Sequence, residues 1–290
     1  MAGFMRVLLY YFPPGEGSAF AFIGWLSTVP DLLATGFFSM AGAFVHMVVM
    51  WFSPLGTSVT GAFRQASLFD AAAFYAFLVT VPTNVNFVVS VEVHFYGQYR
   101  RYFDAITGGG TIGQISVARE NMRAVLRQEV SKLVQVQLFF LVVYMLAMRY
   151  FLSGIGFTSD MIAMFQVMCI GYSAYCLGNS LMLLLLYFND RKGALAAAFA
   201  LFAVNLAVSL LTRTGPSLLY GIGVPAGGMA MFLTAMPRLL AYVERIDYHV
   251  FCSQPVFNTY ETGRFMRLAG WLDARAARSK PTLGRGKTGR

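Results

Sequence analysis

Long stretches without a single charged residue dominate this chain. Asp, Glu, Lys and Arg are absent from residues 32–63, 71–91, 133–148, 161–189, 194–212 and 214–237. An α-helix rises about 1.5 Å per residue and the hydrocarbon core of a bilayer is about 30 Å thick, so about 20 apolar residues cross it. Five of the six stretches reach or nearly reach that length, and 133–148 does so if Lys132 and Arg149 extend to the headgroups. The sequence therefore predicts an all-α, polytopic transmembrane helical bundle.

The composition excludes a water-soluble domain and suggests how the chain is divided. Hydrophobic residues make up 57% of the sequence and charged residues 12%, whereas a soluble domain carries about 25% charged residues. We predict a partial N-terminal helix with an interfacial segment at 1–29 and six full spans within 30–242. A basic tail then follows at 243–290. The longest polar connection between spans, 96–132, is predicted to contain a helix over 115–132 and a glycine turn before it.

The Lys and Arg residues in the connections predict the orientation. Eight lie in the connections 96–132 and 189–193, and three lie in the connections on the opposite side. Because cytoplasmic loops are the ones enriched in Lys and Arg, the basic connections and the C-terminal tail are expected in the cytoplasm. This topology accounts for the net charge of +9, so membrane lipid is the expected partner and nucleic acid is not.

No residue pattern in the chain indicates catalysis. His46, His94 and His249 are far apart in the predicted topology, and no His, Asp or Glu spacing suits a metal ion. Cys169 and Cys176 lie two helical turns apart within one apolar span and are interpreted as packing residues. We therefore expect no catalytic residue, no metal and no cofactor, and the chain is not predicted to be an enzyme.

Four polar residues within the predicted spans are candidates for function, because polar groups at membrane depth are costly and often functional. They are His46, Asn84, Asn86 and Glu92, and the hypothesis is that they line a polar cavity between helices. Hydrogen bonding between helices is the alternative for the two asparagines, and a buried hydrogen-bonded role is the alternative for His46. Glu92 lies near the end of its span, where a neighbouring arginine is the alternative partner.

Two prolines are candidate hinges. Pro82 lies near the middle of the predicted span 70–95, where the missing N–H of proline predicts a kink. Pro225 lies within the predicted span 216–240 beside several glycines. Small residues also allow helices to approach closely, so simple packing is the alternative explanation for this glycine-rich segment.

Several motifs, taken together in order and spacing, resemble one family of membrane proteins. They are Trp51-Phe52-Ser53-Pro54, Ser67-Leu68-Phe69-Asp70, Glu92 with Tyr99-Arg100-Arg101-Tyr102-Phe103-Asp104, Tyr187-Phe188-Asn189-Asp190-Arg191-Lys192-Gly193, and Glu244-Arg245 with Tyr248-His249-Val250-Phe251. These motifs resemble the PelG family, the inner-membrane transporters of the Pel exopolysaccharide system. That family is similar to the multidrug/oligosaccharidyl-lipid/polysaccharide exporters. The resemblance covers roughly residues 12–257.

The resemblance implies a bacterial inner-membrane protein that exports a polysaccharide for the biofilm matrix. It also implies membrane partners and a cytoplasmic glycosyltransferase. Members of the family have two six-helix bundles around a central cavity, and this chain corresponds to the second bundle. The sequence departs from the family pattern at His46-Met47 and at His94 and Gly97, where the family carries more charged residues. The polysaccharide that the resemblance implies is partly cationic and should favour acidic cavity walls. The smaller number of acids in this chain therefore weakens the match to that substrate.

Two other functions are compatible with the sequence. A cation-coupled small-molecule antiporter of the same superfamily would need an intramembrane Asp or Glu, and the predicted spans offer none between their ends. A membrane scaffold that transports nothing would recruit cytoplasmic enzymes through 96–132 and the basic tail.

Overall fold

The computed structural model describes residues 29–61, 63–216 and 219–248, together with Arg267, 270–272 and 274–275. The predicted segment 1–29 and most of the predicted tail 243–290 lie outside the described residues. Residues 34–254 form one compact unit, and the helices described below belong to it apart from the first turn of α3.

Six helical segments of the described residues are long and apolar enough to cross a membrane. They are α3 (Pro30–Trp51), the segment Ser67–Thr107, α7 (Ile112–Gly154), α8 (Ser159–Tyr187), α9 (Arg191–Thr212) and α10 (Gly223–Glu244). Side chains close the first turns of three of them. Thr111, Thr158 and Asp190 each accept a hydrogen bond from a backbone N–H of the helix that follows. The prediction of an all-α membrane bundle is confirmed.

The second membrane segment is one continuous helix whose α-helical winding is interrupted twice. It consists of α4 (Ser67–Phe77), a 3₁₀ turn (Leu78–Thr80), α5 (Val81–Val89), a π-helical segment (Ser90–Phe95) and α6 (Tyr96–Thr107). The 3₁₀ turn directly precedes Pro82, which lacks an N–H and crowds the carbonyl one turn earlier. The predicted irregularity at Pro82 therefore has a local physical cause.

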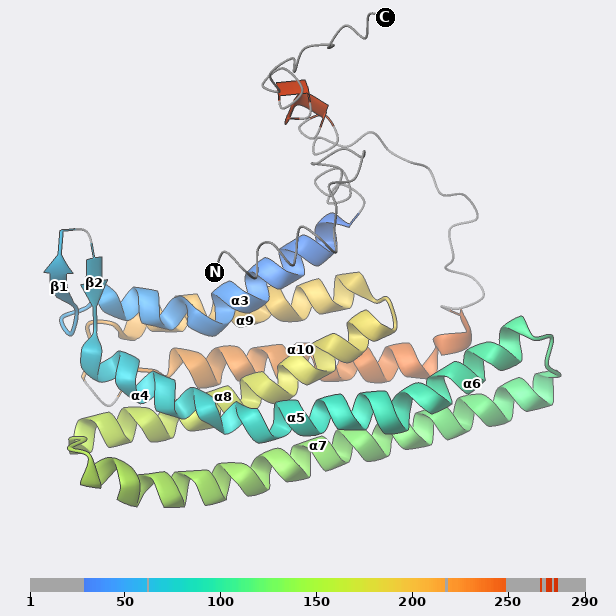
Figure 1. Cartoon of the computed structure of the whole chain (residues 1–290), viewed down its shortest axis with the longest axis horizontal. Coiled ribbons are helices and arrows are strands. Elements are labelled where there is room, and N and C mark those ends of the chain that lie inside the picture. Colours follow the sequence, from blue (N-terminus) through green and yellow to red (C-terminus); the bar gives the residue numbers. More distant parts are fainter. Residues whose placement is uncertain are drawn as a thin grey trace, which may run out of the picture. The chain divides into compact units, whose positions relative to one another are not determined.

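The predicted polar connection 96–132 is a helical hairpin. Its first arm is α6, its turn lies at residues 108–111, and its second arm is the first half of α7 (Figure 1). Thr111 and Gln114 form a capping box at the start of α7, with Gln114 Oε1 accepting from the N–H of Thr111 at 2.9 Å. The 43 residues of α7 correspond to about 65 Å at 1.5 Å per residue, which is twice the hydrocarbon thickness. The predicted span 133–152 is thus the second half of a longer helix.

A small β-hairpin lies at the other end of the second membrane segment. Strand β1 (Thr57–Thr60) pairs antiparallel with β2 (Phe63–Gln65), and Thr57 lies opposite Gln65. This hairpin forms the connection between α3 and α4. Nearby, Trp51 Nε1 donates to both carboxylate oxygens of Asp70 at 3.1 Å, which joins the end of α3 to the start of α4.

Helices α8, α9 and α10 pack closely because small residues lie at their contacts. A Cβ on Gly171 of α8 would lie 2.6 Å from Pro225 Cδ, and a Cβ on Gly228 of α10 would lie 2.7 Å from the carbonyl oxygen of Gly171. Such backbone approach is typical of membrane helices. The glycine-rich segment of α10 therefore lies at a close helix contact, and its flexing at Pro225 stays a prediction.

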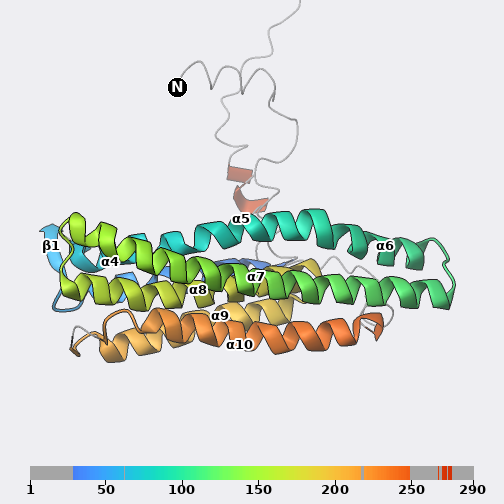
Figure 2. The same cartoon turned by 90° about the horizontal axis from the view of Figure 1, so that it is seen from below.

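Two hydrophobic cores fill the bundle. One surrounds Met122, Leu185 and Met231 near the turn of the α6–α7 hairpin, and the other surrounds Phe69 and Phe165 near the β-hairpin. The helix series α4–α6 lies alongside α7 in both views (Figure 2). We call the end of the bundle that holds the α6–α7 turn, the connection between α8 and α9, and the end of α10 the basic end.

Candidate functional site

The first group of polar side chains inside the bundle, which we call the polar cluster, consists of His46, Tyr172, Asn205 and Ser209. Tyr172 Oη lies 3.1 Å from His46 Nε2, and Asn205 Nδ2 lies 3.4 Å from His46 Nδ1. Asn205 also donates to the carbonyl oxygen of Gly42 at 2.8 Å and accepts from Ser209 Oγ at 3.1 Å. The cluster therefore joins α3, α8 and α9 through hydrogen bonds that satisfy each member.

His46 occupies the buried, hydrogen-bonded setting that was the alternative to lining a cavity. Its exposed fraction is 0%, and its ring packs edge-on against Phe69 with the centroids 5.8 Å apart. Both ring nitrogens have polar neighbours within the polar cluster. His46 therefore lies in the core of the bundle, and a role in lining a cavity stays a prediction.

The second group, which we call the polar stripe, has the opposite character. Thr83 Oγ1, Asn86 Nδ2, Ser90 Oγ, Gln137 Oε1 and Glu129 Oε2 are buried atoms without a hydrogen-bond partner in the described part of the chain. An unsatisfied polar group in hydrocarbon costs several kcal/mol. Ordered water is the usual partner of such buried groups. The polar stripe is therefore the part of the bundle where we expect water molecules to bind.

The members of the polar stripe lie along one helix interface. At 100° per residue, Thr83, Asn86 and Ser90 share a face of the helix with Val79. The carbonyl oxygen of Val79 accepts a hydrogen bond from Gln137 Nε2 at 3.4 Å, which places this face against α7. Gln137 also donates to Ser173 Oγ of α8 at 2.8 Å. The stripe thus lies between the α4–α6 series and α7.

The two predicted asparagines differ in their surroundings. Asn86 is half-buried and belongs to the polar stripe. Asn84 is exposed and lies on the outward face of α5 between Val81, Val85 and Val88, which are also exposed. Its Oδ1 accepts from the thiol of Cys176 at 3.4 Å. The structure does not bring Asn84 or Asn86 together with His46, which lies in the polar cluster.

A buried carboxylate that sequence reasoning missed lies at one end of the polar stripe. Glu129 of α7 is 8% exposed, and its Oε1 lies 3.6 Å from His94 Nδ1 of the π-helical segment. Lys132 Nζ lies 3.8 Å from its Oε2. The predicted acid, Glu92, is in the same π-helical segment, but its side chain lies outside the described residues. Arg100, its expected partner, pairs with Asp104 at 3.6 Å.

The two candidate hinge prolines occupy different helix positions. Pro82 is the second residue of α5 and follows the 3₁₀ turn. Pro225 is the third residue of α10, which begins at Gly223 and not at 216 as predicted. Proline is tolerated in a first turn without bending the helix, so the position of Pro225 does not by itself require a bend, and its role as a hinge stays a prediction. The interior proline of α10 is Pro237.

At the basic end, ion pairs and hydrogen bonds hold the α6–α7 hairpin to the end of α10. Asp247 accepts from Tyr102 Oη at 2.8 Å and pairs with Arg119. Arg123 donates to the carbonyl oxygens of Val243 at 3.0 Å and Glu244 at 2.7 Å. Carbonyl groups at the C-terminus of a helix such as α10 lack a partner within the helix, and Arg123 supplies one.

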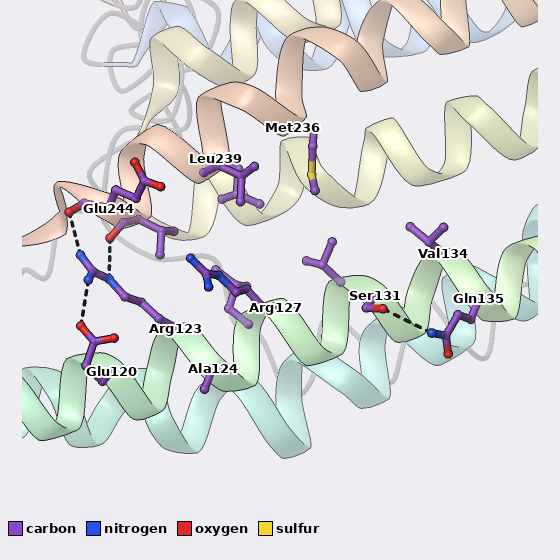
Figure 3. A pocket seen from close by; sticks show the side chains of 14 residues that line it. Glu120, Arg123, Ala124, Arg127, Ser131, Val134, Gln135, Met236, Leu239 and Glu244 are labelled. Atoms are coloured by element: carbon purple, nitrogen blue, oxygen red, sulfur yellow. Dashed lines mark hydrogen bonds and ion pairs between the residues drawn. The ribbon is translucent and has the colours of Figure 1, made fainter.

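A groove of about 460 Å³ runs between α7 and α10 next to these contacts (Figure 3). Its walls are mainly apolar, with Val134, Met236 and Leu239 among them, and its charged residues include Arg123 and Arg127. None of the residues predicted from the sequence lines it. Within the described residues, no group of three His, Cys, Asp or Glu side chains could hold a metal ion.

Comparison with known proteins gives one match. The model of the PelG family, described as "Putative exopolysaccharide Exporter (EPS-E)", matches residues 1–251 of this chain. No curated protein and no solved structure matches it.

Proposed function

Because the chain belongs to the PelG family of exopolysaccharide exporters, we propose that it carries an exopolysaccharide of the biofilm matrix across the bacterial inner membrane. The family description is that of an exporter, and the six membrane-length helices among the described residues fit that role. We place the basic end and the C-terminus in the cytoplasm, because the connections at this end carry most of the Lys and Arg residues.

The observation that carries the proposal furthest is the exposed side chain of Asn84, whose Oδ1 accepts from the thiol of Cys176 at one edge. It lies near the middle of a membrane segment, among valines on the outward face of α5. A polar side chain facing lipid at this depth is unfavourable, and such residues normally face a protein partner or a water-filled cavity. We therefore assign the outward face of α5 to the wall of the export path.

Helix α3 extends this wall. Phe37, Met40 and Phe44 are exposed along one side of α3, and the ring of Phe44 lies 5.9 Å from that of Phe77 at the end of α4. A sugar polymer needs both hydrogen-bonding groups and apolar ring faces along its path, and these two helices offer both. The opposite wall would come from a second helix bundle, as in the two-bundle architecture that the family resemblance implies.

Export by this route requires the wall to move. We propose that the bundle rocks around the path and that the segment bends at the 3₁₀ turn before Pro82, where the α-helical hydrogen-bond pattern is already interrupted. A role for Pro225 in this motion has less support, because it lies in a first turn. Membrane partners and a cytoplasmic glycosyltransferase would deliver the polymer at the basic end.

Secreted polysaccharide is the measurement that tests this function. The chain, in the protein context in which it occurs, is expected to restore secretion to cells from which its gene has been deleted. Asn84→Trp should reduce secretion to the level of the deletion, because the bulky ring would fill the path. Leu146→Trp is the matched control, since Leu146 is an exposed residue of the membrane half of α7.

Equal secretion by the Asn84→Trp and Leu146→Trp variants, at equal protein levels in the membrane, would remove α5 from the export path. Secretion that does not depend on the chain at all would favour the scaffold or antiporter alternatives. A scaffold would instead be needed for recruiting the glycosyltransferase to the membrane, which fractionation of the cells measures.

A further inference from the structure

Glu129 is an ionisable group buried where the sequence offered no reason to expect one. Its carboxylate is nearly inaccessible, whereas the side chains of its two partners, His94 and Lys132, are each 46% exposed. Both separations, 3.6 and 3.8 Å, are longer than a hydrogen bond. The carboxylate therefore lies between two half-exposed basic side chains on one side and the interior of the bundle on the other.

The polar stripe connects this carboxylate to the interior of the membrane. Ser90 is four residues before His94, and Thr83 is seven residues before Ser90, about 10 Å along the helix axis at 1.5 Å per residue. On the facing helix, Gln137 is eight residues after Glu129, about 12 Å along the axis. Hydroxyl and amide groups with free hydrogen-bonding capacity therefore follow one another along both sides of the interface.

The π-helical segment brings the two ends of this arrangement together. A π-helix inserts an extra residue in a turn, and such segments are frequent at functional sites. Here Ser90, an unsatisfied member of the polar stripe, and His94, the partner of Glu129, belong to the same six-residue π-helical segment. The π-helical segment thus directs both the hydroxyl of Ser90 and the imidazole of His94 toward α7.

We propose that the polar stripe is a water-filled proton path and that Glu129 is its proton-binding group. A hydronium ion in the path gives its proton to the Glu129 carboxylate, which leaves a carboxylic acid and a water molecule. Release reverses this step, and the proton leaves to the basic end past His94. This proposal rests on the proposed export function for its purpose, since it names a proton gradient as the energy source of export.

The charges around Glu129 link proton binding to movement. His94 comes from the π-helical segment and Lys132 from α7 itself, while α8 carries no charged residue between Asp160 and its end at Tyr187. Residues 81–91 on the facing helix are also uncharged. Protonation of Glu129 removes the negative charge that holds His94 of the π-helical segment near α7. The π-helical segment can then separate from α7 and change the wall formed by α5.

Infrared difference spectroscopy tests the proposal without any substrate. The full chain is purified, placed in lipid vesicles and transferred from neutral to acidic buffer, and the carbonyl band of protonated carboxyl groups is recorded. Glu129→Gln should remove a component of this band. Glu120→Gln should leave that component in place, because Glu120 is a 59% exposed carboxylate of the same helix, paired with Arg123.

The path itself is tested by the rate at which this band component appears after a rapid pH change. Ser90→Ala and Thr83→Val remove hydroxyl groups that have no hydrogen-bond partner among the described residues, so they should slow the protonation of Glu129 while the chain remains folded. A band that is identical in Glu129→Gln and in the unmodified chain would overturn the proposal. A protonation rate unchanged by both hydroxyl variants would overturn the path. Secretion that still depends on the chain would show that the export function stands in either case.

Discussion

The polar cluster and the polar stripe lie within the same helical bundle but differ in how their members are paired. In the polar cluster, the side chain of Asn205 by itself interacts with three residues, Gly42, His46 and Ser209. In the polar stripe, Thr83 and Ser90 are equally buried and have no hydrogen-bond partner among the described residues. Because hydrocarbon offers no partner of its own, the comparison suggests that paired groups stabilise the fold and unpaired groups mark where water enters.

The largest expected effect comes from breaking the polar cluster. Asn205→Leu removes the donor to Gly42 and the neighbour of His46, and it leaves Ser209 without its acceptor. We expect a loss of about 2–3 kcal/mol in the free energy of unfolding, since orphaned buried groups cost about 1–3 kcal/mol each. Unfolding by denaturant in mild detergent measures it. A loss below about 0.6 kcal/mol, the average value of a hydrogen bond between membrane helices, would contradict a structural role for the cluster.

A second change tests how tightly the cluster is enclosed. A Cβ on Gly223 would lie 2.6 Å from Asn205 Oδ1 and would also meet Ser209 Oγ. Gly223→Ala should therefore destabilise the bundle by about 1–3 kcal/mol, the usual cost of overpacking. Gly113→Ala is the control, because a Cβ there meets nothing within 4 Å and alanine is the better helix former. Equal melting temperatures for the two variants would show that the cluster is loosely packed.

The smallest effect on stability is expected in the polar stripe. Thr83→Val keeps the shape of the side chain and removes a hydroxyl that has no hydrogen-bond partner in the part of the chain that the structure describes. Its free energy of unfolding should stay within about 0.5 kcal/mol of the unmodified chain, because no protein hydrogen bond is lost. The same denaturant titration measures this variant. A loss as large as that of Asn205→Leu would mean that Thr83 has a protein partner in solution and that the two regions do not differ.

The membrane segments could be predicted from the sequence because lipid leaves the backbone few alternatives to a helix. The β-hairpin at Thr57–Gln65 could not, because both of its strands are exposed and bury no face that would set a pattern. Pro225 was placed at mid-helix because the apolar run begins at Thr214, whereas the helix begins only at Gly223. Apolar composition alone does not distinguish a helix from the turn before it.

The polar cluster required knowing which helices are neighbours, and His46 and Asn205 are 159 residues apart. Glu129 is different, because a signal for its burial was present. Leu126, Glu129, Leu133 and Gln137 recur at the three- and four-residue spacing of one helix face, and all four are buried. Treating 96–132 as a connection between spans concealed this face.

Thiol accessibility tests the distinction between the two regions most directly. In a chain whose three native cysteines have been replaced, Ser90→Cys and Ser209→Cys place matched thiols in the polar stripe and the polar cluster, at positions that are both buried. With a small water-soluble thiol reagent, we expect the thiol at position 90 to react in the folded protein and the thiol at position 209 to react only after unfolding. Equal protection of both thiols would contradict a hydrated stripe, and faster reaction at position 209 would reverse the assignment.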